Sequence, residues 1–123
     1  MTLDSIGVIG GEAWGTALAQ TLRLAGRDVV LWAREPETVD DINIRHVNRA
    51  YLPGIDLEPG LRATTQLLDV ARCDGVLMVA PAQHVRAMAG ELANHMRDGQ
   101  PLVLCAKGLE QSTGQLMSEV VAQ

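Results

Sequence analysis

Three glycines gather near the start of the chain, in the segment IGGEAWG at residues 9–15. Gly10 and Gly15 have the spacing of the outer glycines in G-x-G-x-x-G, in which the first allows a tight turn and the last lets a helix pack closely on a strand. The helix after such a turn offers backbone N–H groups and a positive dipole end to a pyrophosphate. The segment therefore predicts a dinucleotide-binding turn, with a glycine-containing turn of some other α/β protein as the alternative. The residues of the predicted turn are Gly10, Gly11, Glu12, Ala13, Trp14 and Gly15.

Glu12 replaces the middle glycine of that motif. The motif has glycine there because the backbone approaches the pyrophosphate, so a side chain adds bulk and a carboxylate adds repulsion. One like-charge pair at about 5 Å costs roughly 3 kcal/mol at an effective dielectric of about 20, and less when the side chain turns to water. We therefore expect binding weakened by about 1–3 kcal/mol, roughly 5- to 150-fold. A positive φ at Glu12 would add a backbone penalty.

Three further residues follow predicted strands and could face the same ligand. Arg34 stands where a NAD site has an acidic residue for the ribose 2′-hydroxyl, and an arginine there suits a 2′-phosphate and hence NADP. Pro81 shapes a loop that could pass beside the nicotinamide. Lys107 directly follows the last strand, where its ammonium could hold an anionic substrate or polarise a carbonyl. The simpler alternatives are a solvated arginine, a helix-opening proline and a surface lysine.

Alternating strands and helices would bring these residues together. The predicted strands are residues 6–10, 28–33, 61–64, 75–80 and 101–106. All but the third are continuous apolar runs, which are typical of parallel strands buried on both faces. The predicted helices are residues 14–25, a segment that opens at Pro36, residues 65–71, residues 83–96, and a segment that begins near Ser112. This order predicts an α/β fold with a doubly wound parallel sheet, whose ligand lies at the carboxyl ends of the strands.

The composition is that of one globular domain, with 123 residues, 47% hydrophobic and 20% charged. A net charge of −5 argues against nucleic-acid and membrane-surface binders, which need a basic face. Cys73 and Cys105 lie far apart in apolar runs and are expected to be reduced core thiols. The histidines form no ligand-spaced cluster with them, so no metal site is expected. The first residues lack the basic start of a signal peptide and no apolar run is as long as a membrane span, which favours a cytoplasmic protein.

Several segments together resemble the bacterial type of NAD(P)-dependent glycerol-3-phosphate dehydrogenase. They are residues 6–10, 14–19 (WGTALA), 30–34 (VLWAR), 48–54 (NRAYLPG), 79–83 (VAPAQ) and 106–110 (AKGLE), followed by Thr113 and Gly114. The WGTALA and KGLE segments are specific, and the order and spacing agree over essentially the whole chain.

The resemblance implies a Rossmann domain that binds NAD or NADP, in an enzyme that interconverts dihydroxyacetone phosphate and sn-glycerol 3-phosphate for phospholipid synthesis. It implies that Ala13, Trp14 and Arg34 contact the cofactor. Lys107 would lie where cofactor and substrate meet, and would bind the substrate too. The family's general acid/base is a later lysine, and its helical C-terminal domain also follows. We therefore expect residues 1–123 to be a truncated dinucleotide-binding domain without a catalytic residue, inactive by itself.

Two other functions stay open at this stage. A non-catalytic nucleotide-binding module would have lost turnover and bind its cofactor weakly because of Glu12. A dehydrogenase of a different hydroxy acid is the other alternative, and the KGLE segment argues against it. The sequence does not distinguish NADP from NAD, since Arg34 and Glu35 could serve either, and a homodimer is one option for the full-length protein.

Overall fold

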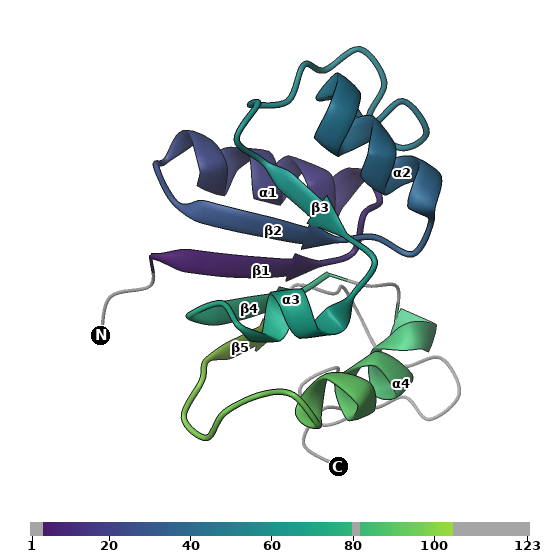
Figure 1. The fold of residues 1–123 in the computed structure, drawn as a ribbon. Helices are drawn as coiled ribbons and strands as arrows, with labels where there is room; N and C mark the ends of the chain where they lie inside the picture. Colours follow the sequence, from purple (N-terminus) through teal and green to yellow (C-terminus); the bar gives the residue numbers. More distant parts are fainter. Residues whose placement is uncertain (1–3, 80–81, 105–123) are drawn as a thin grey trace.

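Figure 1 shows the fold in a computed structural model, which describes residues 4–79 and 82–104. The predicted alternation of strands and helices is confirmed over these residues, with shifted bounds. The elements are β1 (Ser5–Ile9), α1 (Ala13–Leu24), β2 (Asp28–Trp32), α2 (Pro36–Asp40), the π-helical turn η1 (Asp41–Arg45), β3 (Arg62–Thr64), α3 (Leu67–Ala71), β4 (Gly75–Met78), α4 (Ala82–Ala93) and β5 (Leu102–Leu104). The helix predicted near Ser112 lies outside the described residues.

All five strands are parallel and have the order β3-β2-β1-β4-β5. The chain moves from the centre to one edge through β2 and β3. It then returns beside β1 as β4 and continues outward to β5. The predicted doubly wound parallel sheet is thus confirmed, and its order reverses between β1 and β4. Open α/β sheets bind ligands in the crevice outside the carboxyl ends of the strands at such a point.

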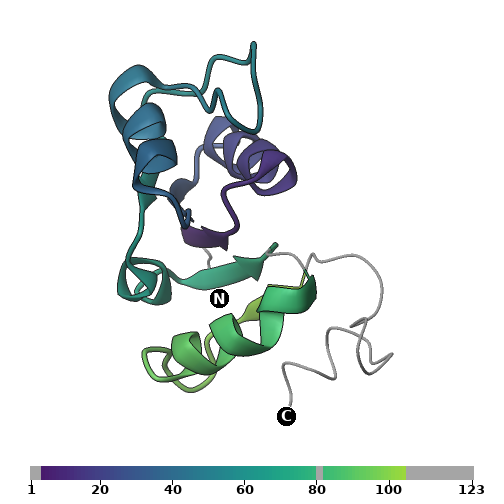
Figure 2. The same cartoon turned by 90° about the vertical axis from the view of Figure 1, so that its right-hand side faces the viewer.

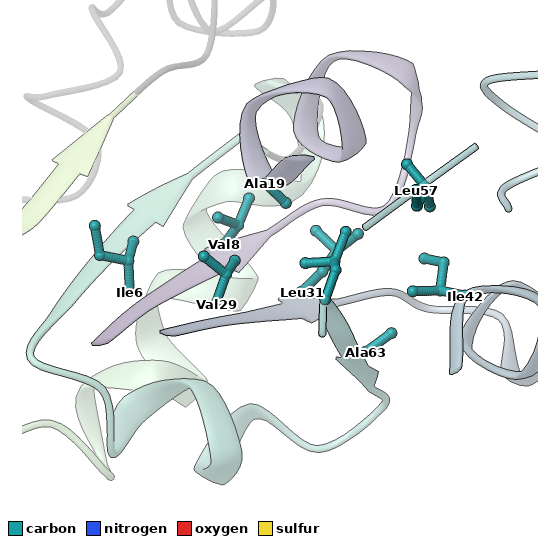
Figure 3. Packing of buried hydrophobic residues seen from close by; sticks show 9 residues of the cluster. Ile6, Val8, Ala19, Val29, Leu31, Ile42, Leu57 and Ala63 are labelled. Carbon is teal, nitrogen blue, oxygen red and sulfur yellow. The ribbon is translucent and has the colours of Figure 1, made fainter. Parts of the chain in front are cut away.

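Helices cover both faces of the sheet, with α1 on one side and α3 and α4 on the other (Figures 1 and 2). The continuous apolar strands supply both faces in alternation, because successive side chains of a strand point to opposite sides. In β1, Ile6 and Val8 belong to the core beneath α1, and Ile9 belongs to the core beneath α3 and α4. Figure 3 shows the first of these cores. Its buried members are Ile6, Val8, Ala19, Val29, Leu31, Ile42, Leu57, Leu61 and Ala63.

The inner face of α1 differs from the one that its apolar residues suggest. Helical spacing groups Ala17, Leu18, Thr21, Leu22 and Ala25. The buried residues of α1 are instead Gly15, Thr16 and Ala19. Small residues face the sheet here, so the helix lies close to it. Thr16 is buried despite its hydroxyl because the hydroxyl is hydrogen bonded to the Gly11 carbonyl at 3.2 Å.

Neither a metal cluster nor a membrane span is found in the part of the chain that the structure describes. No group of three or more histidine, cysteine, aspartate or glutamate side chains there could hold a metal ion. No helix within residues 4–79 and 82–104 has the length and apolar character needed to cross a bilayer. Cys73 is buried with a free thiol, and burial raises the pKa of that thiol. Cys105 lies outside the described residues.

Gly7 allows α3 to lie directly against β1. A Cβ atom on Gly7 would come 2.3 Å from Val70 Cγ1 and 2.9 Å from the Val70 carbonyl oxygen. We therefore expect Gly7→Ala to reduce the free energy of unfolding by about 1–3 kcal/mol, the usual cost of overpacking a core. Urea unfolding of the wild type and the variant measures this difference.

Gly90→Ala is the matched control for that substitution. Gly90 lies in α4, and nothing lies within 4 Å of the Cβ that alanine would add. Alanine favours helix over glycine by about 0.5–1 kcal/mol, so the control variant should be at least as stable as the wild type. A Gly7→Ala variant as stable as the wild type would contradict the close packing of α3 on β1.

Candidate dinucleotide-binding site

The glycine-rich turn lies at the carboxyl end of β1, beside the point where the strand order reverses. Gly10 follows β1 with φ of 131°, a conformation that favours glycine, and its N–H donates to the Trp32 carbonyl at 3.0 Å. The chain then enters α1, whose N-cap is Glu12. The first bond inside the helix runs from the Thr16 N–H to the Glu12 carbonyl at 3.0 Å. The amides before it form the helix N-terminus at the crevice, where such groups have no acceptor within the helix.

Two of the three glycines are required by close contacts. A Cβ on Gly15 would come 1.8 Å from the Gly10 carbonyl oxygen, because the first turn of α1 packs directly on the turn before it. A Cβ on Gly11 would come 2.5 Å from the Ala33 Cβ, because the turn also packs on the end of β2. Gly10 is favoured by its positive φ. The predicted turn thus forms, with glycine needed at positions 10, 11 and 15.

Glu12 fits the turn without backbone strain. Its φ of −80° and ψ of −175° are extended values that any residue adopts, so the backbone penalty of a positive φ does not arise. The side chain is exposed and makes no capping hydrogen bond to α1. The turn accommodates Glu12 sterically, and its expected effect on an anion is therefore electrostatic. An exposed carboxylate at this position carries the same sign of charge as the ligand expected there.

A buried asparagine from another part of the chain supports the turn. Asn48 is 1% exposed, and its Nδ2 donates to the Gly11 carbonyl at 2.9 Å and to Thr16 Oγ1 at 2.8 Å. Its Oδ1 accepts from the Tyr51 N–H at 3.2 Å. Asn48 belongs to the NRAYLPG segment, and the sequence indicates no role for it. The only signal for Asn48 in the sequence is that it belongs to a segment that resembles the family. A single asparagine in a loop belongs to no repeating pattern that would indicate a role.

The segment around Asn48 is itself anchored by Asp41. The Asp41 side chain is 8% exposed and accepts hydrogen bonds from the Arg49 N–H at 3.0 Å and the Arg49 guanidinium at 2.7 Å. Arg45 adds a bond at 3.2 Å. The hydrogen bonds from Arg49 are the main cause that lowers the pKa of Asp41 from 3.8 to about 2. The buried carboxylate of η1 therefore holds Arg49, the residue next to Asn48.

Three charged or polar residues meet beside the turn at the end of β2. Arg34 is exposed in the loop between β2 and α2, and Glu35 is the N-cap of α2. The Tyr51 hydroxyl donates to Glu35 Oε1 at 2.9 Å. This bond, and then the charge of Glu35, raise the pKa of Tyr51; Glu12 adds to the increase and Arg34 opposes it. The turn, Arg34 and Tyr51 therefore share one electrostatic environment.

The structure thus brings together the turn residues and Arg34, as the sequence analysis expected for one ligand. It adds Asn48, Tyr51 and Glu35 to them. Pro81 and Lys107 lie outside the described residues, so their predicted positions beside the nicotinamide and the substrate stay predictions.

The pKa of Asp41 leads to a pH-dependent stability. A carboxylate with a lowered pKa contributes stability above its unfolded pKa of 3.8, and this contribution is lost as the pH falls towards the folded value of about 2. We expect Asp41→Asn to be less stable than the wild type by a constant amount above about pH 5, and the difference to narrow between about pH 4 and about pH 2. Urea unfolding at each pH measures it.

Asp40→Asn is the control, since Asp40 is an exposed neighbour on the same turn. Its stability should follow that of the wild type at every pH. The contrary result is a free energy of unfolding of Asp41→Asn that differs from that of the wild type by the same amount down to about pH 2. That result would show that the Asp41 contacts do not stabilise its carboxylate in the folded state.

Comparison with known proteins gives the family of this chain. Residues 5–123 match the family model described as NAD-dependent glycerol-3-phosphate dehydrogenase N-terminus. The chain is 63% identical over 120 residues to glycerol-3-phosphate dehydrogenase [NAD(P)+] of Paramagnetospirillum magneticum, covering 98% of this chain and 44% of that protein. It is 54% identical over 123 residues to the Caulobacter vibrioides protein of the same name, covering 100% of this chain and 37% of that protein.

Solved structures agree with the sequence match. Glycerol-3-phosphate dehydrogenase from Coxiella burnetii superposes with a TM-score of 0.88 at 29% identity, covering 97% of this chain and 37% of that one. The Saccharomyces cerevisiae enzyme gives 0.86 at 28% identity, covering 98% and 39%. The chain spans less than half the length of these relatives. The resemblance in the sequence is thereby confirmed, and the chain belongs to the NAD-dependent glycerol-3-phosphate dehydrogenase family, corresponding to its N-terminal region.

Proposed function

We propose that this chain is the cofactor-binding part of a dehydrogenase that interconverts dihydroxyacetone phosphate and sn-glycerol 3-phosphate with NAD(P)H. The observation that carries the proposal is the turn from Gly10 to Gly15 at the point where the strand order reverses. Its glycines let the end of β1, the end of β2 and the start of α1 pack around one helix N-terminus. The names of the relatives favour this function over a non-catalytic nucleotide-binding module.

The pyrophosphate would bind at the start of α1. The amides of Glu12, Ala13 and Trp14 lie at the positive end of the helix dipole, where a phosphate is stabilised. The carboxylate of Glu12 opposes this attraction. Because that side chain is exposed, water screens its charge, and we expect the smaller part of the range given by the sequence, about 1 kcal/mol. The turn would therefore bind a dinucleotide, more weakly than the same turn with a neutral residue 12.

The adenosine ribose would lie at the end of β2, beside Arg34. Glu35 in this place could bind the 2′-hydroxyl of NAD or repel the 2′-phosphate of NADP. The Tyr51 hydroxyl already engages Glu35 at 2.9 Å, which satisfies one carboxylate oxygen inside the protein. Arg34, which is exposed, carries the positive charge that a 2′-phosphate requires. We infer that the site accepts NADP and also tolerates NAD.

The remaining assignments rest on the family. Bound NAD(P)H would supply the hydride, and Pro81 and Lys107 would line the nicotinamide end, with Lys107 also binding the substrate. We assign no general acid/base among residues 1–123, so we expect these residues to bind cofactor without turning over dihydroxyacetone phosphate. We further propose a cytoplasmic enzyme of phospholipid synthesis that forms a homodimer and binds no nucleic acid.

Titration of the chain with NADPH and with NADH tests the proposed function. We expect saturable binding of both, and Arg34→Ala should weaken NADPH binding roughly 10- to 100-fold, the loss of a charge-assisted hydrogen bond, with little change for NADH. Arg62→Ala is the control because Arg62 is an exposed arginine on β3. Failure of the wild-type chain to bind either nucleotide would overturn the proposal. An equal loss for NADPH and NADH in Arg34→Ala would refute the contact between Arg34 and the 2′-phosphate.

Glu12→Gln tests the repulsion separately, since it removes the charge and keeps the size. We expect about 5-fold tighter NADPH binding at low salt, and a smaller gain at high salt because exposed charges are screened. Glu37→Gln makes the same change of net charge on α2 and should leave the affinity nearly unchanged. Equal NADPH dissociation constants for Glu12→Gln and the wild type would show that the carboxylate does not act on the phosphates.

A further inference from the structure

The Gly11 carbonyl points into the protein and is held there by two donors. Thr16 Oγ1 donates to it at 3.2 Å, and Asn48 Nδ2 donates at 2.9 Å. Thr16 is 0% exposed and Asn48 is 1% exposed, so both bonds are protected from water. A buried carbonyl held by two protected donors has little freedom to rotate.

The direction of this carbonyl sets the direction of the next amide. The peptide bond between Gly11 and Glu12 is planar, and the described residues contain no cis peptide, so its N–H and C=O point in opposite directions. With the Gly11 carbonyl pointing inward, the Glu12 N–H points outward at the start of α1. Helix N-termini of this kind are where phosphates bind.

Both polar atoms of the Asn48 side chain are hydrogen bonded in this arrangement. Nδ2 makes two bonds and Oδ1 accepts from the Tyr51 N–H at 3.2 Å. Exchanging the two ends of the amide would place an oxygen against the Gly11 oxygen, so the network fixes its orientation. The Leu52 N–H also donates to the Asn48 carbonyl at 2.8 Å, which holds the backbone of the same residue.

We propose that Asn48 is a positioning residue for phosphate binding: by holding the Gly11 carbonyl inward, it aims the Glu12 amide at the pyrophosphate of the dinucleotide. The inference rests on the proposed function and adds a residue that lies 37 positions from the turn. It makes the affinity of the turn depend on the segment after η1, and thus on the Asp41–Arg49 pair that anchors this segment.

The test compares two ligands that share the adenosine end but differ at the phosphates. NADPH contains the pyrophosphate, whereas 2′-AMP lacks it and keeps the 2′-phosphate. In Asn48→Ala we expect NADPH binding to weaken about 10-fold or more, and 2′-AMP binding to change by less than about 2-fold. A merely structural effect would weaken both ligands alike, so the ratio of the two dissociation constants is the decisive quantity.

Asn43→Ala is the matched control. Asn43 likewise joins two segments through backbone bonds, donating to the Ala63 carbonyl at 3.0 Å and accepting from the Ala63 N–H at 2.8 Å. It lies on η1 and braces β3 rather than the turn. Its removal should lower the unfolding temperature and leave both dissociation constants within about 2-fold of the wild type.

Thr16→Val keeps the inference testable if Asn48→Ala does not fold. This change removes the other donor to the Gly11 carbonyl with little change of shape, and we expect a selective loss of NADPH affinity of about 3-fold or more. If Asn48→Ala folds and binds NADPH as tightly as the wild type, the inference is wrong. An equal loss of affinity for NADPH and for 2′-AMP would also contradict it. If Asn48→Ala does not fold, the same two outcomes in Thr16→Val decide. If the wild-type chain binds no NADPH, the proposed function itself fails, and the inference fails with it.

Discussion

The backbone of Gly15 lies so close to the Gly10 carbonyl that a Cβ atom would come within 1.8 Å of the oxygen. This contact sets the angle at which α1 leaves the sheet and places its N-terminus at the carboxyl end of β1. Gly11 repeats the constraint towards Ala33, at the end of β2. The first two strands and the first helix thus meet around one short turn, which has no room for a side chain at positions 11 and 15. A turn of this kind presents the backbone amides at the start of α1 to a ligand.

The turn also depends on residues that follow it by 30 or more positions. Asp41 is buried and holds Arg49, and Asn48 beside it holds the Gly11 carbonyl and Thr16. These bonds connect η1 and the loop after it to α1 and to the turn before α1. Buried side-chain networks are rigid when every member is satisfied, and this one leaves no buried side-chain nitrogen or oxygen without a partner among the described residues.

The elements of the fold could be predicted from the sequence because their cause is local. Continuous apolar strands and glycines at turns mark a parallel sheet, and helices between the strands make it doubly wound. The buried face of α1 could not be predicted in this way, because the Thr16 hydroxyl is buried with hydrogen bonds to Gly11 and Asn48, which hydropathy does not register. The role of Asn48 was missed for a similar reason, because this side chain is bonded to Gly11 and Thr16, which lie 37 and 32 positions earlier in the chain.

The position of the turn beside Arg34 could be predicted from the sequence, whereas the contacts around them could not. The turn and Arg34 meet as expected, whereas the backbone at Glu12 is unstrained, so its glutamate affects charge rather than conformation. Tyr51 and Glu35 add a hydrogen bond that no motif in the sequence indicates. At the proposed ribose position, the balance is therefore between Arg34 and Glu35, whose carboxylate is already hydrogen bonded to Tyr51. Such a balance depends on the distances between neighbouring charges, which the amino-acid sequence alone does not give.

The amides at the start of α1 are proposed to bind the phosphates of a dinucleotide, and every role assigned to the turn depends on this binding. An amide-resolved NMR titration of the ¹⁵N-labelled chain with NADPH, and in parallel with adenosine, tests it most directly. We expect the amide signals of Glu12, Ala13 and Trp14 to shift together and saturably with NADPH, and to stay in place with adenosine. If NADPH binds while these three signals remain unshifted, the phosphates lie elsewhere and the account is wrong.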